Sequence, residues 1–358
     1  MSDDLPTSTT PPHRRRPRYR GTHPRHFTEK YKELNPEKYA DEVARIAASG
    51  KTPAGMHRPV MVGEIIAVLT PKAGDVAVDC TLGYGGHAEE LLTAITPGGR
   101  LIGLDQDPVE FPKTEARLRA KGFGPEVFLA RRTNFAGLPQ VLAENALPGA
   151  DILLADLGLS SMQIDNPARG FTFKATGPLD LRMNPERGQP ASTLLAKLDE
   201  PRLAALLEAN ADEPHAALIA EAVVRAHAQR PIKTTTALAD AVRVALRKLS
   251  KQDREQEGDA PVRRVFQALR IAVNDEFGAL DTLLRQLPAC LKPGGRAAIL
   301  TFHSGEDRRV KKAFEAGRAA GVYETIAEEV TRPGAEEQRA NPRSSSAKLR
   351  WAVRSNQA

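Results

Sequence analysis

The residues with the clearest chemical potential form a glycine-rich run, Gly83-Tyr-Gly-Gly-His87, which follows Asp79 and directly precedes a helical pattern. Glycines at a strand-to-helix turn let the backbone turn sharply and approach a ligand with no Cβ in the way. Asp105 ends the next strand, about 20 residues on, where a carboxylate can accept both hydroxyls of a ribose. Together these features predict a site for an adenosyl-type ligand, whereas the glycine turn alone would be weak evidence and would more often be a tight loop.

The charge of this run indicates which adenosyl ligand it would take. The phosphate-binding spacings GxGxxG and GxxxxGK[ST] are absent, and no Lys or Arg follows the loop to meet a pyrophosphate. Asp79 places a negative charge near the turn, which would repel a pyrophosphate but suits an ammonium or a sulfonium. We therefore predict S-adenosylmethionine as the cofactor, with a dinucleotide as the alternative.

Polar residues also follow two later strands. Asp156 ends one strand and Gln163 follows shortly after it, while His303, Glu306 and Asp307 come directly after another. Ligands of open α/β sheets bind beyond the carboxyl ends of the strands, so we predict that Asp156 and Gln163 face the cofactor cleft and that the other three share its rim. The alternatives are that Asp156 only caps the following turn and that His303 is structural rather than catalytic.

The secondary-structure elements that must position these residues can be predicted from the hydrophobic pattern of the chain. After His57, short β-rich runs alternate with helical stretches, which is typical of a parallel α/β sheet. We predict about seven strands, at 75–80, 100–105, 126–130, 151–156, 295–301, 323–331 and 347–354. The last two would form a closing, hairpin-like pair. The fold class is therefore α/β with a Rossmann-like sheet, and the long gap between the fourth and fifth strands is helical.

Three parts of the chain are expected. Residues 1–55 form a basic N-terminal extension, in which 1–27 cannot form a core and 36–49 show a short helical pattern. The sheet core occupies 56–164 and 259–358. Residues 165–258 form an inserted helical subdomain for substrate recognition, with an exposed loop at 251–259, where nearly every residue is charged or polar.

Composition narrows the class of protein. Apolar residues make up 41% of the 358 and charged residues 27%, which is ordinary for a soluble globular chain. No uncharged apolar run approaches the roughly 18 residues that span a bilayer, and the N-terminus has no apolar signal core. Cys80 and Cys290 lie far apart in apolar segments, without metal-ligand spacing, and are interpreted as reduced core residues. We predict a cytoplasmic protein with no membrane partner and no metal; the sequence specifies no oligomeric state.

The formal net charge of +6 is unevenly distributed. Six arginines and no acid lie between Leu5 and Thr28, and the segment 332–354 is also basic. Basic ends commonly contact polyanions because each neutralised phosphate releases a counterion, and aromatic residues among the arginines favour RNA. The alternative is a solvated tail without a partner.

Taken together, the motifs resemble those of the bacterial small-subunit (16S) rRNA cytosine N4-methyltransferases. The resemblance runs in order over residues 56 to 354. It rests on His57-Arg-Pro-Val60, Asp79-x-Thr-x-Gly-x-Gly-Gly-His87, Asp156-Leu-Gly-x-Ser-Ser161, Arg169-Gly-Phe-x-Phe173, Leu179-Asp-x-Arg-Met183, Phe266-Gln-Ala-Leu-Arg-Ile-x-Val-Asn274, Gly294-Gly-Arg-x-x-x-Leu-Thr-Phe-His-Ser304 and Asn341-Pro-Arg-Ser-x-Ser-Ala-Lys-Leu-Arg350.

The resemblance implies a Rossmann-type methyltransferase core with a helical insertion, acting on 16S rRNA or the small ribosomal subunit. It implies that S-adenosylmethionine is held by Gly85, Gly86 and His87 at the methionine end, Asp105 at the ribose, Phe135 beside the adenine, and Asp156 and Gln163 closing the pocket. The alternatives are another RNA or DNA base-amino methyltransferase and a non-catalytic RNA-binding ribosome assembly factor.

Methyl transfer to a base amine requires the enzyme to activate a poor nucleophile. The lone pair of an exocyclic amine is delocalised into the ring, so the enzyme must align the amine and accept hydrogen bonds from its N–H groups. Asp156 is the predicted acceptor and His303 the second catalytic candidate, although Leu157-Gly158 replaces the Pro-Pro pair of many nucleic-acid amino methyltransferases.

Three departures from the family pattern stand out. Gly305 occupies a position where leucine is common, which would loosen the rim. Residues 210–214 read Asn-Ala-Asp-Glu-Pro where a Tyr-Gly-Glu-Glu run is usual, which puts the substrate contacts there in doubt. The first 55 residues have no counterpart in a typical member.

Overall fold

The computed structural model describes residues 59–356. The predicted basic arm and the short helical pattern at 36–49 lie outside this range. Within residues 59–356, every helix is too short or too polar to span a lipid bilayer.

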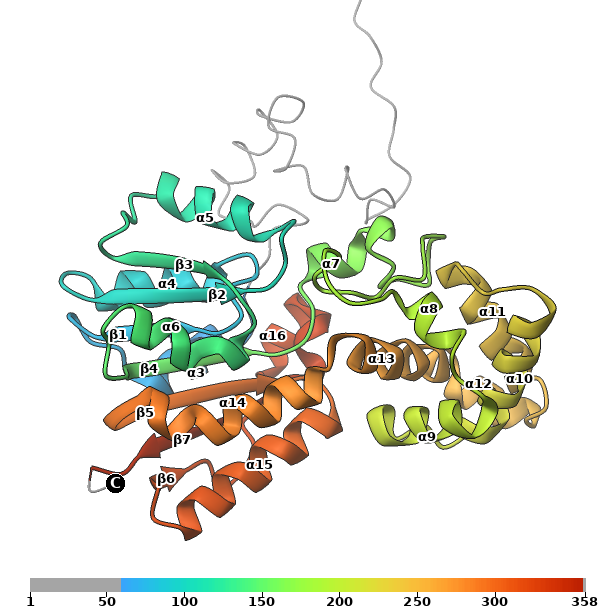
Figure 1. Cartoon of the computed structure of the whole chain (residues 1–358). Coiled ribbons are helices and arrows are strands. Elements are labelled where there is room, and N and C mark those ends of the chain that lie inside the picture. Colours follow the sequence, from blue (N-terminus) through green and yellow to red (C-terminus); the bar gives the residue numbers. More distant parts are fainter. Residues whose placement is uncertain (1–58, 357–358) are drawn as a thin grey trace, which may run out of the picture. The chain divides into compact units, whose positions relative to one another are not determined.

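The described part of the chain is built on one seven-stranded sheet, which confirms the predicted α/β, Rossmann-like class (Figure 1). Its strands are β1 (Val76–Asp79), β2 (Arg100–Asp105), β3 (Phe128–Arg132), β4 (Ala150–Asp156), β5 (Leu291–Thr301), β6 (Tyr323–Ile326) and β7 (Lys348–Arg354). The spatial order is β3-β2-β1-β4-β5-β7-β6. The first five pair in parallel, and β7 runs antiparallel between β5 and β6, so the expected closing pair is present.

Helices cover both faces of this sheet, as the mostly apolar central strands β1, β2, β4 and β5 require. One face packs against α3 (Val62–Leu69), α4 (Gly86–Ile95) and α5 (Phe111–Ala120), and the other against α6 (Leu138–Glu144), α14 (Glu276–Cys290) and α15 (Ser304–Ala319). Successive side chains alternate between the two: Ala77 and Leu154 enter the first layer, while Val78 and Leu153 enter the second. Cys80 and Cys290 are buried free thiols, as predicted.

Several boundaries differ from prediction. β3 begins at Phe128 instead of 126, and β6 ends at Ile326 instead of 331. Two further differences have a local cause. β5 begins at Leu291 instead of 295, because the chain pairs with β4 through a register shift that accommodates Pro293 and the following glycines. The expected loop at 251–259 contains a helix, α12 (Lys251–Glu257), whose first turn is capped by the Ser250 hydroxyl accepting from the Asp253 amide. Its residues are nearly all exposed, so no apolar stripe marks it in the sequence.

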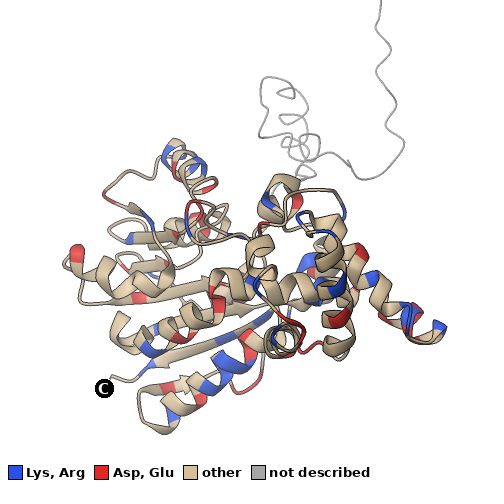
Figure 2. Ribbon diagram, turned by 45° about the vertical axis from the view of Figure 1, so that its right-hand side comes forward, with Lys and Arg blue, Asp and Glu red and all other residues tan. Residues whose placement is uncertain are grey.

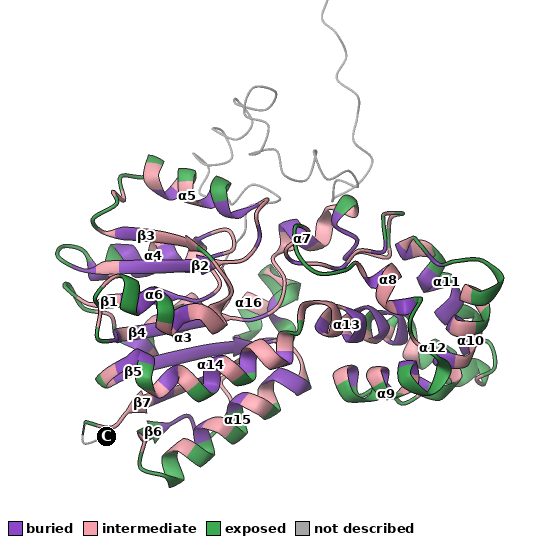
Figure 3. Ribbon diagram, viewed as in Figure 1, coloured by how far each residue is buried: buried purple, intermediate pink, exposed green. Residues whose placement is uncertain are grey.

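A second group of helices lies beyond the carboxyl ends of the strands (Figure 1). We call α8–α13 the helical subdomain: α8 (Ala191–Leu195), α9 (Glu200–Ala211), α10 (Ala216–Gln229), α11 (Thr235–Leu246), α12 and α13 (Ala260–Asn274). It has its own hydrophobic core, visible as buried inner faces in Figure 3. Phe266 of α13 packs there against Phe173 in a tilted arrangement, with ring centroids 5.6 Å apart. Because α13 shares this core, it packs with the segment that we assign to the insertion; the division at 165 and 258 stays a prediction.

The junction between α13 and α14 brings this subdomain back to the sheet. Asp275 adopts a left-handed conformation with φ of 48°, which ends α13 and starts α14 in a new direction. The break therefore places Asn274 and Glu276 beside the carboxyl ends of β2 and β4, where both line the same pocket as Asp105 and Asp156.

Candidate active site

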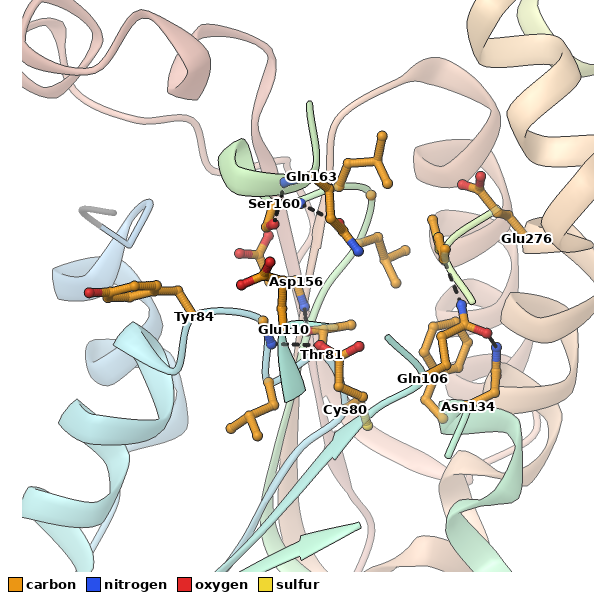
Figure 4. A pocket seen from close by; sticks show the side chains of 18 of the residues that line it. Cys80, Thr81, Tyr84, Gln106, Glu110, Asn134, Asp156, Ser160, Gln163 and Glu276 are labelled. Carbon is orange, nitrogen blue, oxygen red and sulfur yellow. Dashed lines mark hydrogen bonds between the residues drawn. The ribbon is translucent and has the colours of Figure 1, made fainter. Parts of the chain in front are cut away.

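A pocket at the carboxyl ends of the strands gathers residues from the glycine turn, β2, β4 and the α13–α14 junction (Figure 4). It encloses about 1230 Å³, counting its open mouth. All seven residues expected to bind the cofactor line it: Gly85, Gly86, His87, Asp105, Phe135, Asp156 and Gln163. Their roles as ligands stay predictions, but they are brought together as the motif order indicated. His303 does not line the pocket directly; it lies one layer behind, against Glu306.

The glycine turn is shaped by backbone conformation more than by ligand approach. Gly83 and Gly85 have φ of 48° and 81°, which disfavour a side chain. A Cβ on Gly85 would come within 2.9 Å of the Thr114 methyl on α5 and would not project toward a ligand. We expected these glycines to open the way to a ligand; at Gly85 the constraint is helix packing and the left-handed turn.

Asp105 joins the turn to the end of β2. Its two oxygens accept the backbone amides of Gly83 and Asp107, each at 2.8 Å. Burial raises the pKa of the Asp105 carboxyl to about 6, although these amide hydrogen bonds oppose the rise. Each oxygen keeps a lone pair, so Asp105 can fix the loop and still accept a ribose hydroxyl.

Asp156 ends β4 and is fixed to the glycine turn by its backbone, which donates to the Thr81 hydroxyl at 2.7 Å (Figure 4). Its Oδ1 atom is buried and has no hydrogen-bond partner within residues 59–356. Burial, and then the negative charge of Glu306, raises the pKa of the Asp156 carboxyl to about 7. A buried, unpaired acceptor of this kind is costly unless a ligand pairs with it.

His87 turns toward protein groups on both sides. Its Nε2 lies 2.8 Å from the Val60 carbonyl oxygen, which can only accept, so Nε2 carries the proton. Burial lowers the pKa of the His87 ring, which favours its neutral form. The unprotonated Nδ1 then faces Asp156 Oδ2 at 3.6 Å. Both atoms are acceptors when Asp156 is ionised, so the ring lies against the carboxyl without donating a hydrogen bond to it. The methionine contact that the resemblance implies for His87 stays a prediction.

Gln163 is held by a local cap and a buried ion pair. It forms a capping box with Ser160, each accepting from the other's backbone amide, and its Nε2 donates to Asp107 Oδ2 at 2.7 Å. The same oxygen receives the Arg169 guanidinium at 2.7 Å. The Arg169-Gly-Phe motif thus fixes the wall of the pocket on which Gln163 stands.

The rim predicted after β5 is only partly assembled. Glu306 lines the pocket and accepts from the Phe302 amide at 2.9 Å. His303 Nε2 lies 3.2 Å from Glu306 Oε1, but neither ring nitrogen makes an aligned hydrogen bond within residues 59–356. Asp307 lies away from the pocket, because Arg350 and Lys348 of β7 hold it at 2.6 and 3.2 Å. The expectation that Asp307 shares the rim is therefore wrong.

Packing against Phe277 explains why position 305 is glycine in this chain. A Cβ there would lie 2.6 Å from Phe277 Cζ, and the Phe277 ring packs against His303 in a tilted arrangement, with centroids 5.8 Å apart. The rim is therefore not loosened by the missing leucine side chain, since Phe277 fills the space.

Sequence reasoning missed several pocket residues. Glu110, five residues after Asp105, leaves its buried Oε2 without a partner among the described residues, and its position just beyond β2 could have marked it. Asn274 ended one of the quoted motifs but received no role, and Glu276 belongs to a helix start with no motif of its own.

The pocket has a consistent charge. Five carboxylates line it (Asp105, Glu110, Asp156, Glu276 and Glu306), and none of its described lining residues is Lys or Arg. Such a lining repels a pyrophosphate and suits a cationic ligand. The ammonium and sulfonium of S-adenosylmethionine fit this donor set.

Comparison with known proteins agrees with that geometry. The profile of the MraW methylase family matches residues 54–355. The chain belongs to this family. It is therefore an enzyme, a methyltransferase dependent on S-adenosylmethionine, and the non-catalytic alternative falls away.

Several curated relatives in this family carry one name. "Ribosomal RNA small subunit methyltransferase H 1" of Lachnoclostridium phytofermentans is 47% identical over 345 residues, covering 96% of this chain and 94% of that protein. "Ribosomal RNA small subunit methyltransferase H 2" of Alkaliphilus metalliredigens is 48% identical over 341 residues, covering 95% and 97%.

The relatives differ in how much of this chain they cover, and the difference concerns the N-terminal extension. "Ribosomal RNA small subunit methyltransferase H" of Symbiobacterium thermophilum is 40% identical, and covers 83% of this chain with 96% of its own length. The first two relatives cover too much of this chain to leave out most of residues 1–55. The expectation that the extension lacks a counterpart is therefore wrong for them.

Proposed function

We propose that this methyltransferase acts in the cytoplasm on the N4 amine of a cytosine in the 16S rRNA of the small ribosomal subunit. The names of the curated relatives, which specify small-subunit ribosomal RNA for those proteins, support the RNA. The ordered motifs support the cytosine amine. The observation that carries the proposal is the buried, unpartnered Oδ1 of Asp156 in an acidic pocket.

The chemistry assigns a task to that oxygen. S-adenosylmethionine, when bound, supplies an electrophilic methyl group. In its ionised form the Asp156 carboxylate accepts a hydrogen bond from the exocyclic amine, which orients the nitrogen and favours its pyramidal, nucleophilic form. After transfer the nitrogen must lose a proton, and Asp156, with a pKa raised to about 7, is matched to receive it near neutral pH.

Neighbouring groups fix the backbone of Asp156 and disfavour the charge of its carboxylate. Thr81 fixes its backbone, His87 faces Oδ2, and Glu306 repels its charge. The target base has to leave its stack to reach this depth, which costs a few kcal/mol and favours an RNA site that is already distorted.

The test is nucleoside mass spectrometry of small-subunit rRNA from cells that lack this protein. We expect the N4-methylcytidine signal to disappear and to return with the wild-type gene. A profile that loses N6-methyladenosine instead would move the acceptor to adenine, and an unchanged profile would refute the proposal.

Complementation with Asp156→Asn links the activity to the site. This variant keeps the shape of the side chain but removes the charged acceptor, so it should accumulate as a folded protein and leave the nucleoside unmethylated. Asp199→Asn, an exposed helix cap on α9, serves as the matched control and should restore the modification.

A further inference from the structure

A second pocket adjoins the acidic one and has the opposite charge. Gln106, Thr133, Asn134 and Asn274 line both pockets, so the two are continuous. The second one is lined by three arginines (Arg132, Arg182 and Arg187) and, among the described residues, by no carboxylate. It encloses about 780 Å³, counting its open side.

The arginines are held at a fixed place relative to the catalytic pocket. Arg182 and Arg187 belong to the segment that leads into the helical subdomain. The Asn274 side chain ties that segment to α13, accepting from the Met183 amide and donating to the Leu181 carbonyl, each at 2.7 Å. Arg132 is the last residue of β3 and so belongs to the sheet. The basic pocket is therefore built from both parts of the described chain.

The three guanidinium groups are not equally engaged. Arg182 is held by Asp180 through two hydrogen bonds of 2.7 and 2.8 Å. Arg132 makes an exposed ion pair with Glu186 at 2.9 Å, where both side chains are about half exposed. Arg187 is exposed and its side chain has no ion-pair partner within residues 59–356. The pocket therefore keeps a net positive charge and free N–H donors.

Opposite charges in continuous pockets indicate two different ligands. S-adenosylmethionine carries no phosphate, so the basic pocket is not required for the methyl donor. An RNA strand carries one phosphate at every nucleotide, and guanidinium groups are well suited to bind them. Lys and Arg are interspersed with acids over the surface helices (Figure 2), so three arginines without a carboxylate in one lining are a local feature.

We propose that the pocket of Arg132, Arg182 and Arg187 binds the phosphodiester backbone of the RNA strand next to the nucleotide that enters the acidic pocket. This inference rests on the proposed function, because it takes RNA as the substrate. Arg132 and Arg187 bind phosphate, and Arg182, already paired with Asp180, supports the loop between them. Such contacts fix the register of the strand, so that one nucleotide faces Asp156.

The test measures binding of a labelled 16S rRNA transcript to the full chain at several salt concentrations, and methylation of small subunits from cells that lack the protein. For Arg132→Ala/Arg187→Ala we expect RNA affinity to fall about tenfold and the slope of log K against log salt to shrink by about 1 to 2, since each lost phosphate contact retains counterions. KM for subunits should rise with little change in kcat, while S-adenosylmethionine affinity and Tm stay the same.

Two further variants separate phosphate binding from a general loss of charge. Lys311→Ala/Arg318→Ala removes two cations from α15, outside both pockets, and should leave RNA affinity within about twofold of wild type. Glu186→Gln releases Arg132 from its ion pair, so it should strengthen RNA binding and steepen the salt slope. A merely structural ion pair would give the opposite sign or no change.

The outcomes distinguish this inference from the proposed function. Equal RNA affinity and salt slope for wild type and Arg132→Ala/Arg187→Ala would overturn the phosphate site, even if wild type methylates rRNA. RNA binding that depends on these arginines, combined with no methylation of cytosine, would instead overturn the proposed acceptor and leave the phosphate site standing.

Discussion

Two carboxylates with buried oxygens, one in each part of the described chain, differ in how those oxygens are paired. In the helical subdomain, Glu213 is fully buried and both its oxygens are paired: Oε2 accepts from Arg264 Nε at 2.7 Å and Oε1 from the His215 amide at 3.0 Å. At the end of β4, Asp156 leaves Oδ1 buried and unpaired. The first arrangement stabilises a fold, and the second holds an acceptor ready for a ligand.

The contrast extends beyond this pair. Among residues 59–356, no buried side-chain polar atom without a partner belongs to the helical subdomain, whereas Asp156 and Glu110 both bring one to the pocket. Other unpartnered buried atoms, on Arg100, Gln286 and His303, belong to residues outside the pocket lining. Native proteins pair nearly all buried polar groups, and the two atoms at the pocket, on Asp156 and Glu110, are the ones that a bound ligand can pair with. The sheet ends carry the chemistry, and the helical subdomain carries a self-sufficient core.

The largest expected effect is on catalysis. Asp156→Asn should lower kcat for methyl transfer by about 10²- to 10³-fold, because it removes a positioned, charged acceptor. The wild-type rate should rise with pH through about 7 as Asp156 ionises, since the ionised form is the acceptor, and the variant should lose this rise. Single-turnover kinetics between pH 5.5 and 8.5 measures both; a variant with wild-type kcat would abolish the distinction between the two carboxylates.

The opposite result is expected at Glu213. Glu213→Ala leaves the Arg264 guanidinium without its main buried partner and should lower the free energy of unfolding by about 3 kcal/mol. Methyl transfer per folded molecule should stay within about twofold of wild type. Urea unfolding followed by circular dichroism gives the first value. A stable but inactive Glu213→Ala protein would place function in the helical core and contradict the comparison.

A third prediction concerns Asp105 at the end of β2 and the affinity for S-adenosylmethionine. Asp105→Ala should weaken S-adenosylmethionine binding by about 1.5–3 kcal/mol, the scale of a charge-assisted hydrogen bond. Calorimetry on the folded variant measures this. Asp75→Ala, a loop carboxylate at the opposite end of β1, is the control and should leave the affinity unchanged. Unchanged binding in Asp105→Ala would remove Asp105 from the cofactor site.

The smallest effect concerns stability and pH. Burial raises the pKa of Asp79 and Asp105 to about 6 and of Asp156 to about 7, against about 3.9 in an unfolded chain. Between these values the folded state binds more protons than the unfolded state, so the contribution of these groups to the free energy of unfolding decreases as pH rises from about 4 to 7. Asp156→Asn should match wild-type stability near pH 4 and exceed it by about 1 kcal/mol at pH 8. This is less than the roughly 4 kcal/mol that the full pKa difference would give, because the Asp156 side chain is 28% exposed and solvent screens its charge. An advantage that shrinks as pH rises would contradict the direction of the shift.

How far the sequence predicts the molecule depends on how local each signal is. β2 was placed at its observed bounds because an apolar run ends in Asp105, and the strand ends brought the seven expected pocket residues together. β5 and α12 were misjudged because Pro-Gly-Gly resembles a turn and a polar, capped helix has no apolar stripe. The position of Asp307 could not be predicted, because its partners Lys348 and Arg350 come from a distant strand. The role of Glu110 could not be predicted either, because an unpaired buried oxygen becomes apparent only in the folded structure.

The contact between Gly305 and Phe277 has a consequence for exchange between relatives. A leucine at 305 and a phenylalanine at 277 compete for one volume, since even a Cβ would lie 2.6 Å from the ring. The two positions, 28 residues apart, are therefore expected to change together: where one carries a large side chain, the other must carry a small one. Transplanting the common leucine into this chain should succeed only when Phe277 is exchanged in the same step.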